Sequence, residues 1–165
     1  MNTARPAVRP VLRNLSRGAA AVEFALLAPV FVTLVLGSIE IGRGCAATQK
    51  LASALREGGR LATMDYSDHL QKGQTPNDKV IQDIRNFLTA SGIPGNKVTL
   101  SITHADGQNA GQTFNFADPG NALSRFQIRA EIPYSALGTT YFIPTHPETL
   151  HATLVWRMGR SSLVD

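Results

Sequence analysis

The order of apolar and polar residues divides the chain into a basic start, an apolar run and a mixed remainder. From Ala19 to Ile39 the side chains are apolar apart from Glu23, Thr33 and Ser38. A helix crosses the hydrocarbon core of a bilayer with about 20 mostly apolar residues, and this run meets that length. A soluble helix of similar composition would carry a polar stripe, which the run lacks. We therefore expect a membrane-spanning helix.

The residues after the apolar run keep a helical period but become amphipathic. From Ala46 to Met64, small and apolar residues recur at helical spacing, and polar residues occupy the other positions. Such a stripe predicts a helix with one buried face that continues the membrane span. The apolar positions are Ala47, Leu51, Ala54, Leu55, Gly58, Leu61 and Ala62. We expect one long N-terminal helix over 19–64.

The patterns in residues 65–165 predict a small α+β domain. Thr75-Pro76 followed by Asp78 is typical of a helix start, and Gly92 is expected to end that helix before Pro94. Period-two alternation then predicts strands, and no second helix separates them. The strands are expected at 98–103, 126–132 and 152–158, with a short edge strand at 112–116. The predicted fold is one helix packed on an antiparallel sheet.

The charge of the chain is concentrated in its first residues. Four arginines and no acid lie in residues 1–17, so the formal net charge of +4 belongs to this leader and the remainder is neutral. A neutral remainder argues against nucleic-acid binding. The leader is compatible with a cytoplasmic anchor, a secretory signal or a mitochondrial presequence, although a signal has a shorter apolar region of about 7–15 residues. Counting Lys and Arg at both flanks favours, by a small margin, a cytoplasmic N-terminus and an external C-terminal part.

Glu23 and Pro29 are the residues that a membrane helix tolerates least. A charge at the bilayer centre costs about 2.5–3.5 kcal/mol on insertion scales, and less near the interface. Glu23 either reaches the headgroups or awaits a cationic partner, such as an α-amine created by cleavage before Ala19. Pro29 would free the carbonyl of Ala25, which allows a kink but is also commonly tolerated in membrane helices.

Three blocks of the sequence resemble a known family. The string Arg17–Val30 (RGAAAVEFALLAPV), with 39–43 (IEIGR) and 56–62 (REGGRLA), resembles the TadE-like pseudopilin family of the Tad (tight adherence) pilus system. The resemblance covers about the first 64 residues. At Gly59 the family more often has alanine, and glycine weakens a helix interior by up to about 1 kcal/mol.

The resemblance implies a processed membrane protein. Residues 1–18 would be a prepilin-like leader, removed between Gly18 and Ala19 by a prepilin peptidase on the cytoplasmic side. The mature chain would be a minor pilin-like subunit or an assembly factor of a Tad-type pilus in the bacterial inner membrane. Residues 65–165 would form its periplasmic domain, and its partners would be other pilins or pilus-assembly proteins. Glu23 and Pro29 would serve assembly.

Signs of catalysis are missing from the sequence. The four histidines are scattered, no nucleotide-binding or nucleophile motif occurs, and Asp106-Gly107-Gln108-Asn109 lacks the ligand ladder of a calcium loop. We expect no enzyme activity, cofactor or metal. The lone Cys45 is interpreted as a packing residue or an intermolecular thiol. The alternatives to a pseudopilin are an unprocessed single-span protein whose outer domain binds a partner or ligand, and a domain released from a cleaved secretory signal.

Overall fold

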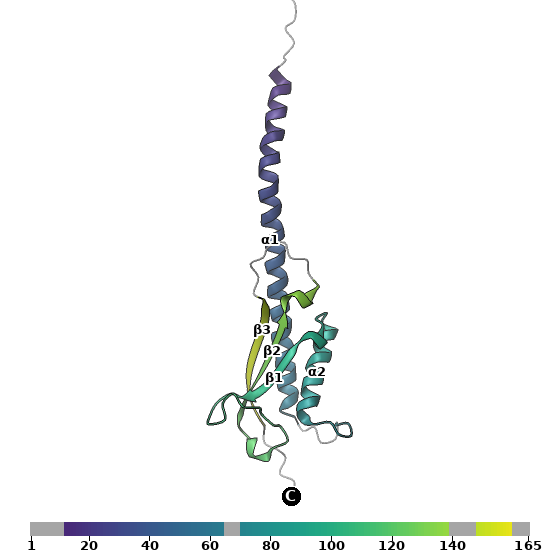
Figure 1. The fold of residues 1–165 in the computed structure, drawn as a ribbon, viewed down its shortest axis with the longest axis vertical. Coiled ribbons are helices and arrows are strands. Elements are labelled where there is room, and N and C mark those ends of the chain that lie inside the picture. Colours follow the sequence, from purple (N-terminus) through teal and green to yellow (C-terminus); the bar gives the residue numbers. More distant parts are fainter. Residues whose placement is uncertain (1–11, 65–69, 139–147, 160–165) are drawn as a thin grey trace, which may run out of the picture. The chain divides into compact units, whose positions relative to one another are not determined.

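The computed structural model describes residues 12–64, 70–138 and 148–159, with the side chains of 12–17 left out. The elements are α1 (Leu12–Ala62), α2 (Pro76–Ala90), β1 (Thr99–His104), β2 (Arg125–Pro133) and β3 (Thr149–Arg157), with short 3₁₀ turns at Gly95–Lys97, Pro119–Asn121 and Tyr134–Leu137 (Figure 1). The chain divides into two compact units, 1–40 and 41–165. The predicted α+β fold is confirmed.

Helix α1 begins before the predicted cleavage position and ends at Ala62, close to the predicted end at residue 64. It starts at Leu12, inside the predicted leader, and runs without interruption to Ala62. Its last turns carry the buried stripe that the sequence predicts, with Leu51, Ala54 and Leu55 fully buried. This stripe, rather than intrinsic helix propensity, holds the C-terminal part of α1 on its domain, since most helical stability in proteins comes from packing.

Helix α2 begins at the predicted capping residue. The Thr75 hydroxyl accepts a hydrogen bond from the backbone N–H of Asp78 (3.1 Å), and the Asp78 carboxylate accepts one from the backbone N–H of Thr75 (3.2 Å). The Thr75 hydroxyl also donates to this carboxylate, and these bonds lower the pKa of Asp78. The helix stops before Gly92, whose φ of +82° suits glycine. Its buried face consists of Val80, Ile84 and Leu88.

The sheet is antiparallel in the order β1-β2-β3. Ile128 of the central strand lies opposite Ile102 of β1 and Leu154 of β3. Even-numbered residues of β2 are buried, as the alternation predicts. Instead of a regular strand at 112–116, the structure has isolated bridges from Thr103 to Thr113 and from His104 to Ala110, because the chain turns tightly at Gly107 and Gly111, both with positive φ.

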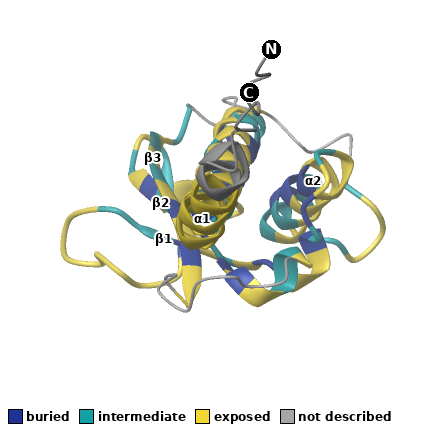
Figure 2. Ribbon diagram, turned by 90° about the horizontal axis from the view of Figure 1, so that it is seen from above, coloured by how far each residue is buried: buried dark blue, intermediate teal, exposed yellow. Residues whose placement is uncertain are grey.

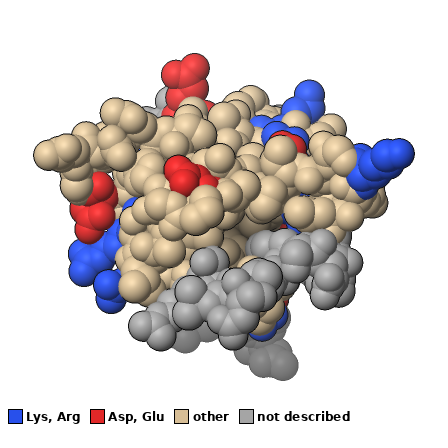
Figure 3. All heavy atoms as spheres, turned by 90° about the horizontal axis from the view of Figure 1, so that it is seen from below, with Lys and Arg blue, Asp and Glu red and all other residues tan. Residues whose placement is uncertain are grey.

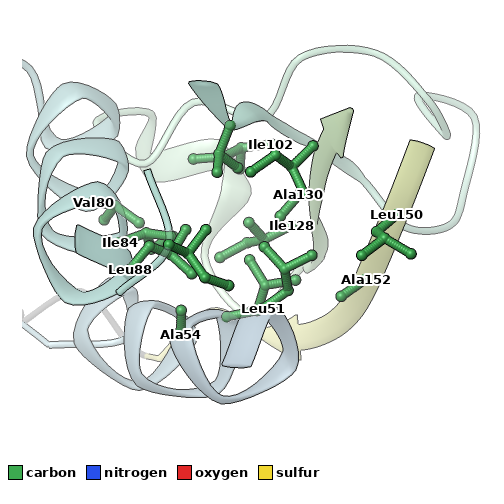
Figure 4. Packing of buried hydrophobic residues seen from close by; sticks show 14 of the residues in the cluster. Leu51, Ala54, Val80, Ile84, Leu88, Ile102, Ile128, Ala130, Leu150 and Ala152 are labelled. Carbon is green, nitrogen blue, oxygen red and sulfur yellow. The ribbon is translucent and has the colours of Figure 1, made fainter. Parts of the chain in front are cut away.

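The core of the second unit lies where α1, α2 and the sheet meet. In Figure 4, Val80, Ile84 and Leu88 of α2 point toward Leu51 of α1 and Ile128 of the sheet. Figure 2 shows the buried residues of α2 on its side toward the strands. Burying each such aliphatic side chain contributes about 1.5–3 kcal/mol relative to exposure. Phe114, Phe116 and Phe126 extend this core with ring centroids 4.9 to 5.3 Å apart.

Two glycines near the end of α1 allow close approach of the other elements. A methyl group added at Gly58 would overlap the side chain of Ile84 on α2, and one added at Gly59 would overlap the indole ring of Trp156 on β3. Both glycines are buried. Gly59, the predicted departure from the family's alanine, is therefore the place where the Trp156 ring lies against the helix.

Candidate functional site

The apolar part of α1 exposes large hydrophobic side chains around its whole circumference. Phe24 and Phe31 are 72% and 68% exposed, and Leu26 and Leu34 are 71% and 65% exposed. Within the described chain, α1 is the one helix whose length and composition are sufficient to cross a membrane, with a mean hydropathy of 2.3 in its most apolar window. In water this surface would remain unburied, whereas in a lipid bilayer the acyl chains would cover it.

The residues of the predicted processing site lie on this same helix. Gly18, Ala19 and Glu23 are all helical and exposed. Because Ala19 and Glu23 are four residues apart, they lie on one face of the helix, one turn from each other. A methyl group added at Gly18 would meet no other atom within 4 Å, so in this structure packing does not require a glycine there.

Pro29 does not interrupt α1, and the hydroxyls in the apolar stretch are satisfied within the helix. The Thr33 hydroxyl donates to the carbonyl of Pro29 (2.8 Å), and the Ser38 hydroxyl donates to the carbonyl of Leu34 (2.8 Å). Such bonds to the preceding turn keep a hydroxyl from being unpaired in an apolar environment. The apolar pattern revealed the helix, but it did not predict these bonds.

Among the described residues, Cys45 and the other chemistry-bearing residues form no cluster. Cys45 is a free, exposed thiol on α1 in the second unit. The described residues contain no group of three or more His, Cys, Asp or Glu side chains that could hold a metal ion. His104 lies against the ring of Phe114, with centroids 4.7 Å apart. On the face in Figure 3, some acidic and basic side chains lie next to each other, and uncharged side chains cover most of the remaining surface.

Comparison with known proteins identifies the N-terminal segment. Residues 18–60 match the model of a family described as TadE-like protein. The matched segment begins at the predicted cleavage glycine and ends beside Gly59, so α2 and the sheet lie outside it. No curated protein and no solved structure matches the chain.

The matched segment contains the apolar part of α1, so the N-terminal helix is the part of the chain that is similar to the TadE-like family. This similarity to the TadE-like family is the one that the sequence resemblance predicted. The roles of Gly18, Ala19, Glu23, Pro29 and Cys45 stay predictions.

Proposed function

We propose that this chain is a minor pilin-like subunit or assembly factor of a Tad-type pilus, without catalytic activity. Helix α1 anchors it in the bacterial inner membrane, with the N-terminus in the cytoplasm and the domain of residues 65–165 in the periplasm. A prepilin peptidase removes the leader between Gly18 and Ala19. The observation that carries the proposal is the match of residues 18–60, which begins at this glycine.

The exposure of the apolar helix supports both anchoring and assembly. Side chains that are exposed around the whole helix are suited to contact lipid before assembly and the helices of other pilins afterwards. Within a membrane, helices associate by close packing rather than by a hydrophobic driving force. Pro29, Thr33 and Ser38 fit such an environment, because the two hydroxyls donate within the helix and need no external partner.

Cleavage before Ala19 would give Glu23 a cationic partner. The new α-amine would stand about one turn from Glu23 on the same helix face, since the two residues are four apart. The amine of a neighbouring subunit is the other candidate partner. In either case the pair would lower the unfavourable free energy of keeping a carboxylate near hydrocarbon.

The mature N-terminus of the membrane-associated protein tests the proposal. Intact mass and terminal sequencing should give a start at Ala19. A start at or near Met1 would contradict processing and leave an unprocessed single-span protein whose outer domain binds a partner. A start well beyond Ile39 would remove the anchor and place the function in a released domain.

A further inference from the structure

The bond that the proposed peptidase would cut lies inside a continuous helix. Helix α1 begins at Leu12, and Gly18 and Ala19 are both helical. In an α-helix the carbonyl of Gly18 accepts a hydrogen bond from the N–H of Val22. Hydrolysis adds the hydroxyl of a water to the carbonyl carbon of Gly18 and breaks its bond to the nitrogen of Ala19, which leaves as an amine. Because the surrounding turns shield this carbon, α1 has to open locally before the cut.

Packing does not explain the glycine at residue 18. A methyl group added there meets no atom within 4 Å, whereas at Gly58 and Gly59 of the same helix it would overlap the side chains of Ile84 and Trp156. Glycine is also a poor choice for a stable helix, since it disfavours the helical state about fivefold relative to alanine. The structure therefore leaves the ease of opening as the physical property that distinguishes glycine from alanine at this position.

Gly18 lies where the opening of α1 is least unfavourable. Residues 12–18 form about two turns at the start of the helix, and helix ends fray. The apolar run begins at Ala19, so backbone groups that open before it can bond to water, whereas groups that open inside a bilayer stay unsatisfied. Residues 19–21 are all alanine, the residue that most favours a helix. The weakest helix former thus stands between the fraying end and a strong helix.

From this placement we propose that Gly18 sets the rate of leader removal by letting α1 open at the bond that is cut, rather than by fitting a pocket of the peptidase. The peptidase acts on an open form in which the chain is extended from the leader through Ala21. When opening and closing are fast relative to cleavage, the cleavage rate follows the population of the open form. This role rests on the proposed function, because it concerns the reaction that removes the leader.

The rate at which a purified prepilin peptidase cuts the full chain in detergent micelles is the first measurement. Intact mass gives the leader-bearing and mature fractions over time. The Gly18→Ala variant should be cut at least about fivefold more slowly than the wild type, since alanine favours the closed helix. Gly42→Ala is the matched control, because it is the same substitution in the same helix and also meets no atom within 4 Å. It should be cut at the wild-type rate.

A second glycine near the cut separates opening of the helix from fit to a pocket. Adding Ala20→Gly or Ala21→Gly to the Gly18→Ala variant weakens the helix again while alanine stays at residue 18. Each double variant should recover about fivefold in the cleavage rate. The control is Ala28→Gly added to the same variant. It weakens α1 beyond the segment that has to open, so it should recover nothing.

Hydrogen exchange at the amide of Val22 measures the opening without the peptidase. This N–H bonds to the carbonyl of Gly18 in the helix, and the exchange rate of an amide follows the population of its locally open state. In the full chain in micelles, Gly18→Ala should slow exchange at Val22 about fivefold. The variant with Gly18→Ala and Ala21→Gly should return to the wild-type exchange rate. Cleavage and exchange should therefore change in the same proportion.

Three results would overturn the role of opening. They are equal Val22 exchange in the wild type and Gly18→Ala, slow cleavage that Ala21→Gly does not recover although it restores exchange, and equal recovery by Ala28→Gly. Each leaves the proposed function intact, because the wild type is still cut after Gly18. A wild-type chain that the peptidase does not cut at this bond would instead contradict the proposed function, and the role of Gly18 with it.

Discussion

Replacing Gly59 with alanine tests the contact between α1 and β3. Alanine is favoured over glycine in a helix interior by about 1 kcal/mol, so helix propensity alone predicts a more stable protein. The added methyl group would, however, overlap the Nε1, Cδ1 and Cε2 atoms of the Trp156 ring. Overpacking of this kind costs about 1–3 kcal/mol. We expect Gly59→Ala to lose up to about 2 kcal/mol of unfolding free energy in the full chain, measured by urea unfolding in detergent with Trp156 fluorescence.

Gly42 provides the matched control for this substitution. It lies in the same helix and in the same compact unit, and an added methyl group there meets no atom within 4 Å. Gly42→Ala should therefore gain up to about 1 kcal/mol. If Gly59→Ala is as stabilising as Gly42→Ala, the indole ring does not rest on the helix at this position. Combining Gly59→Ala with Trp156→Leu should recover part of the loss, and pulse proteolysis would measure this because the variant lacks tryptophan.

Three further substitutions test the processing site and the start of α2. The Gly18→Ala variant should fold and insert normally, because the added methyl group meets no neighbour. It should nevertheless retain its leader, which intact mass would show as a larger protein. Normal maturation and normal surface pili would refute the prepilin assignment. The Glu23→Ala variant should insert into the membrane slightly better, with a gain in insertion free energy below the roughly 2.5–3.5 kcal/mol that a central charge costs. It should nevertheless assemble fewer pili. Unchanged assembly would mean that the carboxylate only reaches the headgroups. Thr75→Ala should lose about 1 kcal/mol of unfolding free energy. Hydrogen bonds from Thr75 lower the pKa of Asp78 in the folded chain. The loss of unfolding free energy in Thr75→Ala should therefore be fully present above the ordinary carboxyl pKa and should shrink as pH falls through the lowered pKa. A loss that does not change with pH would contradict this coupling between the Asp78 pKa and stability.

Much of the fold was predictable because its signals are local. The capping sequence at Thr75 and the stop at Gly92 act within a few residues, and the alternation in β2 reflects one buried face. The start of β3 was predicted three residues late, since Thr149-Leu150-His151 follows a loop and shows little alternation by itself. The bridges at Thr113 and Ala110 depend on the turn between them and β1, which a propensity pattern does not encode.

The candidate site was predictable only in part. The apolar run and the resemblance pointed to Gly18 and Glu23, but the roles that we propose for them depend on a peptidase and a membrane rather than on contacts within the chain. The order of the strands was out of reach of the sequence, because it follows from how all three strands pair with one another. Nor does helical periodicity reveal that Gly59 contacts a tryptophan on a distant strand.

The glycine pair at the end of the TadE-like segment is a place where α1 contacts the rest of its domain. The match ends at residue 60, beside Gly58 and Gly59, against which the Ile84 side chain of α2 and the Trp156 ring of β3 lie. In the proposed function, cleavage and the membrane constrain the residues before this point, whereas contacts with Ile84 and Trp156 constrain Gly58 and Gly59. An alanine at residue 59, as the family more often has, is incompatible with the observed place of the Trp156 ring. The contact with the Trp156 ring of β3 therefore accounts for the glycine at residue 59.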